Sequence, residues 1–322
     1  MSNHQITIVG VPGPGAEDVL VGDDGTVWTG TADGAIHALD PAGGSTRRVA
    51  RTGGRPLGLE WLPDGRLLVC DAERGLLAVS TEDGALEELV TEVDGERLRF
   101  TNNAAVAEDG TIWFSDSSRR WGVREWKSDL IEHTRSGRLF RRDPGGRVET
   151  VLDGLAFANG VALAADGSAV YVAETALRRV RRVGLAGGRP SGDQPVGSEG
   201  MEATLSSADL LVDDLPGYPD NIARGSDGLV WVTIASPPDP VLGLLQTRAS
   251  QRVRALALRL PDALKPAPQR TVRVQAYDGQ GALRHDLEGD ATDWHMATGV
   301  REHDGRVWLG SLVEPAVAWL EV

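Results

Sequence analysis

The chain of 322 residues repeats one short pattern six times. In each copy, an Asp-Gly pair separates two short stretches in which apolar residues alternate with others. The pairs begin at Asp24, Asp64, Asp109, Asp166, Asp227 and Asp304. Asp-Gly between two alternating stretches is a strong sequence signal for a β-hairpin, and a period of two does not suit a helix. The repeat therefore predicts an all-β fold.

The stretch after the Asp-Gly pair carries a bulky residue at a nearly fixed offset. Trp28, Leu68, Trp113, Trp231 and Trp308 stand four residues after the Asp, and Tyr171 stands five residues after it. Further apolar stretches follow most copies, which gives about four strands for each unit. Six such units predict a six-bladed β-propeller, and we expect it to form one domain over residues 1–322.

The last copy has room for only three strands. We expect a strand at about residues 5–10 to supply the fourth, because this would close the ring and cover exposed strand edges. Two segments, about 117–137 and about 236–270, are too long for the repeat. The second begins and ends with prolines and carries spaced Leu and Val residues, which predicts a helical insertion in blade five. We expect a lid over an apolar substrate; a dimer contact, a membrane contact or a partner contact are the alternatives.

Seven residues before each repeat Asp stands one equivalent position. These positions hold Glu17, Leu57, Asn102, Asn159, Asp220 and Ala297. The first strand of each blade lines the central channel, so four oxygen-bearing side chains should converge there. Two carboxylates and two amides cannot neutralise one another, whereas a divalent cation would. Oxygen donors alone predict a hard ion, Ca²⁺ first, with Mg²⁺ or Mn²⁺ as substitutes. The alternative is that these are turn residues bonded to their own backbone.

Composition narrows the partners and the compartment. A net charge of -14 argues against nucleic acid and anionic membranes as partners. Cys70 is the single cysteine, which excludes an internal disulfide and a zinc–thiolate cluster. The start of the chain, MSNHQ, does not resemble a signal peptide, and no long apolar run is present. We expect a cytoplasmic protein without a membrane anchor; the sequence is silent on its oligomeric state.

Four stretches resemble the strictosidine synthase-like branch of the SMP-30/gluconolactonase superfamily. They read GAEDVLVGDDGTVWTGTADG, FTNNAAVAEDGTIWFSDSS, GLAFANGVALAADG and LPGYPDNIARGSDGLVWV. The resemblance implies a six-bladed propeller. It also implies a Ca²⁺ or similar ion, held in the hydrolytic relatives by a Glu, two Asn and an Asp. Matched motif by motif, these fall on Glu17, Asn102, Asn159 and Asp220.

Two departures from the family pattern bear on the chemistry. Asn103 stands where the family usually has an Asp beside the ion, which puts a base role there in doubt. Plant strictosidine synthases place a catalytic Glu shortly before the last turn; here the corresponding place lies near Thr298. No carboxylate stands between Asp293 and Glu302. This argues against a Pictet–Spengler condensation and favours the hydrolytic relatives.

Several further residues are candidates for the site. His295 precedes the inner strand of blade six and is a candidate base beside Asp220 and Glu17, although a lone His is more often structural. Asp116 ends the second strand of blade three, where it would support the ion or cap a loop. Candidates for contact with substrate, or for support of the site, are Asn103, Asp116, Trp121, Trp126 and Thr298.

These patterns together predict a metal-dependent hydrolase of small apolar lactones or aryl esters. The ion would act as a Lewis acid on the carbonyl oxygen and stabilise the oxyanion that develops. One alternative is a strictosidine synthase-like biosynthetic enzyme, catalysing condensation, cyclisation or rearrangement, with a structural metal. Another is a non-catalytic propeller that binds a partner, since a fold does not assign a function.

Overall fold

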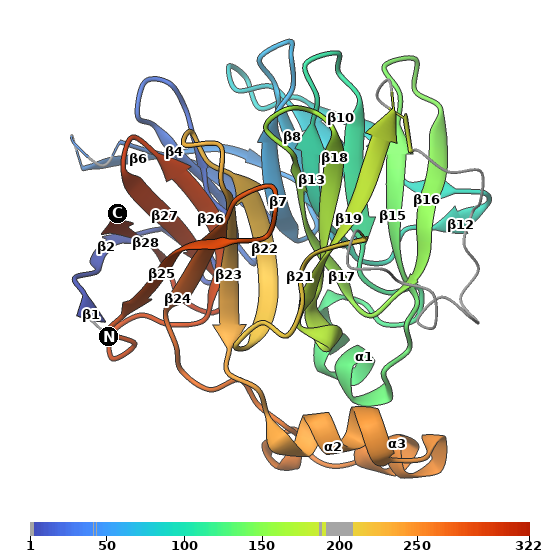
Figure 1. The fold of residues 1–322 in the computed structure, drawn as a ribbon. Helices are drawn as coiled ribbons and strands as arrows, with labels where there is room; N and C mark the ends of the chain where they lie inside the picture. Colours follow the sequence, from blue (N-terminus) through green and yellow to red (C-terminus); the bar gives the residue numbers. More distant parts are fainter. Residues whose placement is uncertain (1–2, 41, 43, 187–188, 191–208) are drawn as a thin grey trace.

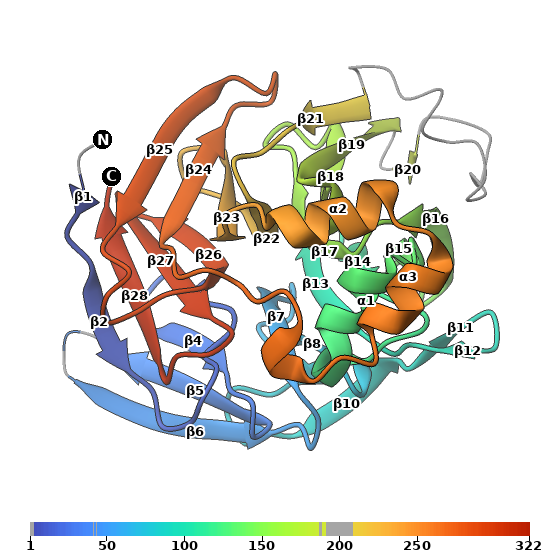
Figure 2. The ribbon, with the colours of Figure 1, turned by 90° about the horizontal axis from the view of Figure 1, so that it is seen from below.

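The computed structural model describes residues 3–40, 42, 44–186, 189–190 and 209–322. Within these residues, the strands form six sheets of four or five strands and one separate two-stranded ribbon, β11 (Glu92–Val93) with β12 (Glu96–Arg97). The six sheets stand around a central axis (Figure 1 and Figure 2). The predicted six-bladed β-propeller is confirmed.

The first three blades follow one another along the chain. Blade one holds β3 (Leu20–Val21), β4 (Val27–Gly30), β5 (Ala35–Asp40) and β6 (Ser45–Arg51). Blade two holds β7 (Pro56–Trp61), β8 (Leu67–Asp71), β9 (Gly75–Val79) and β10 (Leu86–Val90). Blade three holds β13 (Thr101–Val106), β14 (Ile112–Asp116), β15 (Gly137–Arg142) and β16 (Val148–Leu155).

The other three blades have additions at their outer edges. Blade four holds β17 (Ala158–Leu163), β18 (Ala169–Glu174), β19 (Arg179–Ala186), β20 (Arg189–Pro190) and β21 (Leu210–Val212). Blade five holds β22 (Tyr218–Arg224), β23 (Val230–Ser236), β24 (Arg273–Tyr277) and β25 (Leu283–Gly289). Blade six holds β26 (Ala297–His303), β27 (Arg306–Ser311) and β28 (Ala316–Glu321).

The N-terminal segment joins the last two blades. β2 (Thr7–Gly10) pairs with β28 and is the fourth strand of blade six. β1 (Asn3–His4), just before it, runs parallel to β25 at the edge of blade five. One short segment thereby covers two sheet edges that would otherwise be free to pair with another chain.

The aromatic residues of the repeat pack between neighbouring blades. Trp113 of blade three lies against Val161 and Val172 of blade four. Tyr171 packs in the same way on residues of blade five, and Trp231 on residues of blade six. Each of these rings is buried. The core is therefore a ring of apolar layers between blades, and the repeat supplies one large side chain to each of these layers.

Both long insertions contain helices on the same face of the propeller. The blade-three insertion forms η1 (Val123–Glu125) and α1 (Trp126–Glu132). The blade-five insertion forms α2 (Pro240–Arg248), α3 (Gln251–Ala257) and η5 (Asp262–Leu264). α2 begins with Pro240 after Asp239, whose side chain accepts a hydrogen bond from the Leu242 N–H at 2.8 Å.

The two insertions contact each other through apolar side chains. Leu130 and Ile131 of α1 share a cluster with Leu242 of α2, and Ala257 of α3 packs against it. In Figure 1, α1 lies next to the blades and α2 and α3 form the outermost layer. The predicted helical segment is present, and its action as a lid stays a prediction. Among the described residues, no helix is long and apolar enough to cross a membrane.

Candidate functional site

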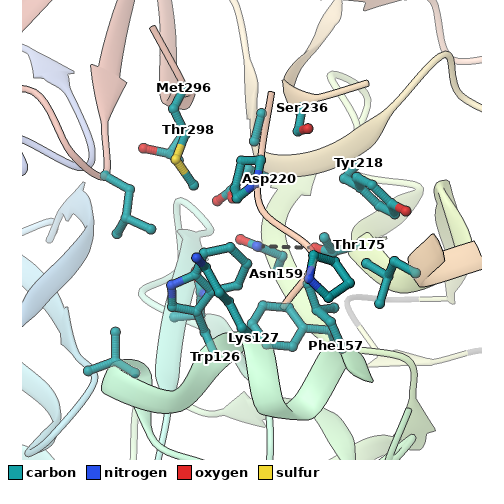
Figure 3. Close-up of a pocket in the computed structure, with 18 of the residues that line it drawn as sticks. Trp126, Lys127, Phe157, Asn159, Thr175, Tyr218, Asp220, Ser236, Met296 and Thr298 are labelled. Carbon is teal, nitrogen blue, oxygen red and sulfur yellow. Dashed lines mark hydrogen bonds between the residues drawn. The ribbon is translucent and has the colours of Figure 1, made fainter. Parts of the chain in front are cut away.

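A pocket lies at the central axis (Figure 3), on the face that carries the helices. It encloses about 830 Å³ of space between atoms, part of it open to solvent. Most of its lining is apolar, including Leu57, Phe100, Leu130, Ile131, Phe157, Leu242 and Met296. An apolar cleft with a few converging polar groups is the usual form of a small-molecule site.

All four predicted metal ligands line this pocket. Asn102 belongs to β13, Asn159 to β17 and Asp220 to β22, while Glu17 stands shortly before β3. Glu17, Asn102 and Asn159 are buried, and Asp220 keeps partial exposure. The repeat thus brings oxygen-bearing side chains from four blades to one place.

Two hydroxyl groups fix the orientation of the amides. Ser117 donates to the Ala158 carbonyl oxygen at 2.7 Å, so its remaining lone pair accepts from the Asn102 Nδ2 at 3.0 Å. Thr175 likewise donates to the Pro219 carbonyl oxygen at 2.8 Å and accepts from the Asn159 Nδ2 at 3.2 Å (Figure 3). Because each hydroxyl proton is already used, each amide must present its NH₂ group to the hydroxyl. Both amide oxygens are therefore available on the other side.

Three buried oxygen atoms in this group have no hydrogen-bond partner within the described part of the chain. They are Oδ1 of Asn102, Oδ1 of Asn159 and Oε2 of Glu17. The other carboxylate oxygen of Glu17 accepts from the Asn221 Nδ2 at 3.3 Å. A buried acceptor without a partner costs about 1–3 kcal/mol, so three in one place require an explanation. A cation bound between them would satisfy all three.

Burial acts against the charged forms of the two carboxylates. The pKa of Glu17 lies well above its ordinary value, first because the group is buried and then because Asp220 and Asp18 are near. Burial also raises the pKa of Asp220 to about 7; a hydrogen bond with Asn159 opposes this rise and Asp18 adds to it. Two carboxylates held in a buried place are stable as anions only beside a positive charge. A divalent ion would match their combined charge.

The donor set narrows the kind of ion. In the part of the chain that the structure describes, no group of three or more His, Cys, Asp and Glu side chains could hold a metal. An ion here would depend on the two amide oxygens as well as on the two carboxylates. Oxygen donors that include neutral carbonyl groups suit a hard cation such as Ca²⁺. The residues present fit such an ion.

The sixth position of the ring differs from the prediction. Ala297 is buried in the core beside Trp231, and Thr298 lines the pocket instead. The cause is the turn of blade six. His303 pairs with Arg306 around a two-residue turn in which Asp304 has a φ of +50°, whereas Val106 pairs with Ile112 around a longer turn in blade three. The shorter turn shifts the count by one residue.

His295, a predicted base, does not line the pocket. Its Nδ1 is bound to the Glu314 carboxylate, and its Nε2 lies 3.4 Å from an Arg270 nitrogen. The next residue, Met296, has a φ of +56° and lines the pocket, as does Phe157, which has a φ of +65°. Met296 thus lines the pocket in the left-handed conformation, while His295, the residue before it, does not line it. The proposed role of His295 as a base therefore finds no support in the pocket lining.

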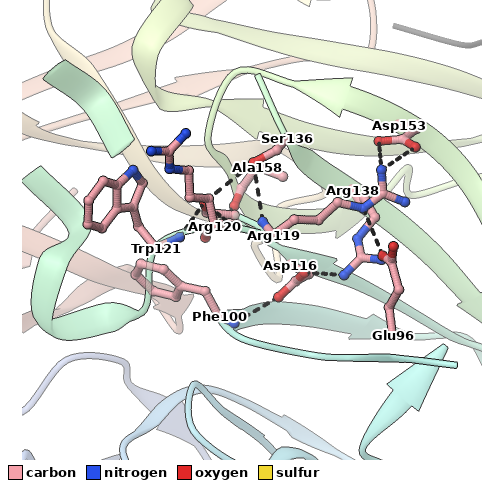
Figure 4. Close-up of polar contacts among 12 residues, drawn as sticks. Glu96, Phe100, Asp116, Arg119, Arg120, Trp121, Ser136, Arg138, Asp153 and Ala158 are labelled. Atoms are coloured by element: carbon pink, nitrogen blue, oxygen red, sulfur yellow. Dashed lines mark hydrogen bonds and ion pairs between the residues drawn. The ribbon is translucent and has the colours of Figure 1, made fainter. Parts of the chain in front are cut away.

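Asp116 and Asn103 hold the scaffold together. Asp116 accepts from the Phe100 N–H at 2.8 Å and from an Arg138 nitrogen at 2.6 Å, so it anchors the loop that enters β13 (Figure 4). Asn103 accepts from the Val161 N–H at 2.9 Å and links blades three and four. Neither residue lines the pocket. Two roles were predicted for Asp116, support of the ion and capping of a loop, and its contacts fit the capping role.

The two tryptophans of the blade-three insertion have different places. Trp126 lines the pocket at the start of α1, beside Lys127. Trp121 lies in a separate outer groove beside Arg120 and donates through its Nε1 to Glu132 at 2.7 Å. Trp126 is therefore placed to contact a bound molecule, and Trp121 supports α1.

A second polar layer lies next to the ring, and of its members the sequence analysis named only Asn103 as a candidate. Counting back six residues instead of seven gives Asp18, Gly58, Asn103, Gly160 and Asn221, and with the blade-six shift Gly299. Polar side chains thus alternate with glycines around the axis. A Cβ at Gly160 would lie 2.6 Å from the Asn221 carbonyl carbon, and one at Gly299 would lie 2.5 Å from the Asp18 Cα. The glycines make room for the polar neighbours, among them Asn221, which orients Glu17. The alternation is visible in the sequence.

Two basic residues near the ring were also missed. Arg55 is buried, donates to the Gly15 carbonyl oxygen at 3.0 Å, and its charge acts to lower the pKa of Glu17. Lys127 is the basic residue that lines the pocket. Neither residue belongs to the repeat, so counting seven residues back from each repeat Asp could not identify them.

Comparison with known proteins gives relatives along most of the chain. The adipocyte plasma membrane-associated protein of Salmo salar is 34% identical over 338 residues, covering 95% of this chain and 77% of its own. The protein STRICTOSIDINE SYNTHASE-LIKE 6 of Arabidopsis thaliana is 33% identical over 299 residues, covering 88% of this chain and 73% of its own. Both identities are high enough, over most of each chain, to indicate common descent.

Solved structures share the fold at lower identity. A gluconolactonase from Xanthomonas campestris has a TM-score of 0.67 at 16% identity, over 98% of this chain and 89% of its own. The calcium-binding protein regucalcin from Agrobacterium tumefaciens has a TM-score of 0.64 at 16% identity, over 96% of this chain and 93% of its own. The family model described as SMP-30/Gluconolactonase/LRE-like region matches residues 19–238. Because the family model matches most of the chain and the fold is the six-bladed propeller, this protein belongs to the SMP-30/gluconolactonase family.

Proposed function

We propose that this protein is a Ca²⁺-dependent hydrolase of small apolar lactones or aryl esters. Membership of the family supports a hydrolase of the lactonase type in general. One observation supports the metal ion and the apolar substrate in particular. Among the described residues, three buried oxygens on Glu17, Asn102 and Asn159 have no hydrogen-bond partner, and they lie at an apolar pocket. Such a set fits a cation next to a space for an apolar substrate.

The proposed chemistry divides between the ion and the chain. A bound Ca²⁺ would supply Lewis acidity to the carbonyl group of the ester. Glu17, Asn102, Asn159 and Asp220 would hold it through their side-chain oxygens. Asp220 keeps partial exposure and lines the pocket, and it would accept the proton of the attacking water. His295 is dropped as a base because it lies outside the pocket lining.

The walls indicate the kind of substrate. Phe100, Phe157 and Met296 present apolar surface to the pocket, and Trp126 adds an aromatic ring from α1. Burial of an apolar group against such walls contributes about 25 cal/mol per Å² of area removed from water. We propose that α1 and α2 act as the lid that excludes water from the bound ester.

Metal content and turnover, measured on the same preparation, test this proposal. We expect about one equivalent of calcium in the purified protein, hydrolysis of some members of a panel of lactones and aryl esters, and loss of turnover in EDTA with recovery on addition of Ca²⁺. Glu17→Gln keeps the shape of the side chain and should lose both metal and activity. Glu314→Gln, which changes a carboxylate outside the pocket lining, is the matched control. Full turnover of Glu17→Gln in chelator would contradict the proposal.

Two other functions remain as outcomes of the same experiment. Metal without hydrolysis of any ester would favour a strictosidine synthase-like biosynthetic enzyme with a structural ion. The place near Thr298 has no carboxylate for a condensation, and Met296 and Thr298 are the blade-six inner residues that line the pocket. Neither metal nor hydrolysis would favour a binding scaffold.

We also propose that the protein acts in the cytoplasm. Cys70 is buried and free of any disulfide, which fits a reducing compartment. Fractionation of cells that express the tagged full chain would check this.

A further inference from the structure

The outer face of the blade-five insertion exposes an unusual amount of apolar surface. In the described part of the chain, six of the eleven large apolar side chains that are exposed lie between residues 241 and 264. They are Val241, Leu244, Val253, Leu256, Leu260 and Leu264, with exposed fractions between 40% and 68%. Single exposed apolar residues are ordinary, but a group of them on one insertion marks a contact surface. We name these six residues the outer apolar patch.

The helices that carry the outer apolar patch are apolar on their inner side as well. Leu242 is buried in the cluster formed with α1, and Leu245 and Leu258 pack against that cluster. A surface helix normally keeps a polar face towards water. α2 and α3 nevertheless form the outermost layer of the molecule (Figure 1 and Figure 2). Their outer side therefore presents the apolar side chains of the patch to solvent, beside polar residues such as Thr247.

The charge of the insertion is opposite to that of the whole chain. Residues 240–265 contain four arginines and one lysine against one aspartate, while the net charge of the protein is -14. Arg248, Arg252 and Arg259 are exposed beside the outer apolar patch. Arg254 is turned inward and donates to the Leu245 carbonyl oxygen at 2.8 Å. The surface around the patch is therefore basic and apolar at the same time.

We propose that the outer apolar patch docks on an anionic lipid surface. Apolar side chains would enter the boundary between headgroups and acyl chains, and the exposed arginines would contact lipid phosphates; this combination is typical of helices that lie in a membrane interface. A second copy of the chain fits less well, because two basic insertions would face each other with like charges.

The net charge of the chain led us to expect no anionic membrane partner, and the position of the insertion changes that expectation. At about 0.1 M salt, charges further than about 10 Å away are largely screened. The lipid surface would respond mainly to the outermost layer, which is basic. The proposal does not depend on the proposed hydrolysis, because it is measured by binding alone.

Vesicle flotation with the full chain tests the proposal. The probes are vesicles of phosphatidylcholine alone and of phosphatidylcholine with one third phosphatidylglycerol, at 0.1 M salt. We expect the protein to float with the anionic vesicles only. The pair Leu244→Ser and Leu256→Ser should weaken binding about tenfold or more, since each buried leucine side chain contributes on that scale. The pair Arg248→Glu and Arg252→Glu should weaken it by a similar factor and make the remainder insensitive to phosphatidylglycerol.

The matched control pair is Leu86→Ser and Leu283→Ser, which removes exposed leucines outside the insertion, one from β10 of blade two and one from β25 of blade five. It should bind as the wild type does. The proposal is overturned if the wild type floats with neither vesicle, or if the control pair loses as much binding as the insertion pair. It is also overturned if the insertion pair changes only the oligomeric state in solution, which would assign the patch to a second copy. Should the leucine pair fail to fold, the arginine pair decides.

Discussion

The axial ring and the helical wall of the pocket are built by different rules. The ring, formed by Glu17, Asn102, Asn159 and Asp220, comes from equivalent positions in a repeated unit, and its atoms are held by backbone strands and buried hydroxyl groups. The wall comes from two insertions whose helices contact each other through apolar side chains. The ring leaves buried oxygens without partners, whereas the wall offers apolar surface. This difference suggests that the ring determines what chemistry is available and the wall determines which molecule is bound.

Substitutions in the ring should have the largest effect on activity. Asp220→Asn removes a negative charge with little change in shape, and we expect a loss of about 10³-fold in kcat, the scale found when a group that stabilises a developing charge is removed. The unfolding temperature without metal should rise, since an isolated buried charge is costly. Steady-state kinetics and thermal unfolding in EDTA measure the two effects. Unchanged kcat would mean that the ring is structural.

Removal of the metal should change stability by a smaller but clear amount. A ligand that binds only the folded state at a hundred times its Kd stabilises by about 2.7 kcal/mol. With an unfolding entropy of about 2.1 cal/mol/K for each residue, this corresponds to roughly 4 °C in the unfolding temperature of a chain of this size. We expect EDTA to lower the unfolding temperature by about that amount at pH 8. Addition of Ca²⁺ should restore it, which calorimetry would show. A variant with a substitution in the helical wall should show the same drop in unfolding temperature when EDTA is added.

The response of stability to pH should reverse when the metal is removed. The pKa of Asp220 is raised by burial to about 7 from an ordinary value of 3.8, and that of Glu17 is raised as well. At a pH between the ordinary and the raised pKa values, the folded, metal-free protein keeps protons that the unfolded chain has released. The free energy of unfolding therefore falls as the pH rises from about 4 to about 7. The metal-free protein should therefore unfold at a higher temperature at pH 5 than at pH 8. The Ca²⁺-loaded protein should show the opposite order, because metal binding is favoured when the carboxylates are ionised.

The same division explains how far the sequence could predict the structure. The repeat predicts the blades, the N-terminal strand beside β28 and the residues of the ring, because each depends on a local pattern carried six times. Where the count failed, at Ala297, the cause was a turn with two residues in place of a longer one, in which Asp304 takes a positive φ. That choice depends on one residue and leaves no mark on the periodicity.

Residues outside the repeat could not be placed by the same means. His295 and Met296 are neighbours, and it is Met296, with a φ of +56° that the periodicity does not show, that lines the pocket. Arg55 and Lys127 approach the ring through long side chains, and their reach depends on packing between elements distant in the sequence. Asn221 is different, since the alternation of polar residues and glycines next to the ring does indicate its place.

Support for the amides gives a prediction of intermediate size. Ser117→Ala removes the hydroxyl that accepts from the Asn102 amide, so the amide is free to turn its NH₂ group towards the ion. We expect about 10–100-fold weaker Ca²⁺ binding, the usual cost of losing a group that orients a ligand. Ser115→Ala is a matched control, because this buried hydroxyl of the same blade donates to the Asn159 carbonyl oxygen and contacts no amide side chain of the ring. Calcium titration by calorimetry measures both, and equal losses would mean that the effect is a general weakening of blade three.

The smallest effect should come from the wall. Trp126→Ala removes aromatic surface from α1 without touching the ring, so we expect KM for apolar esters to rise about tenfold, with kcat and Ca²⁺ affinity nearly unchanged. Trp121→Ala, in the outer groove, is the matched control and should leave KM close to that of the wild type. The comparison of ring and wall depends on this separation between KM and kcat. If Trp126→Ala lowered kcat as strongly as Asp220→Asn while KM stayed constant, the wall would take part in the chemistry, and the division between the two regions would be wrong.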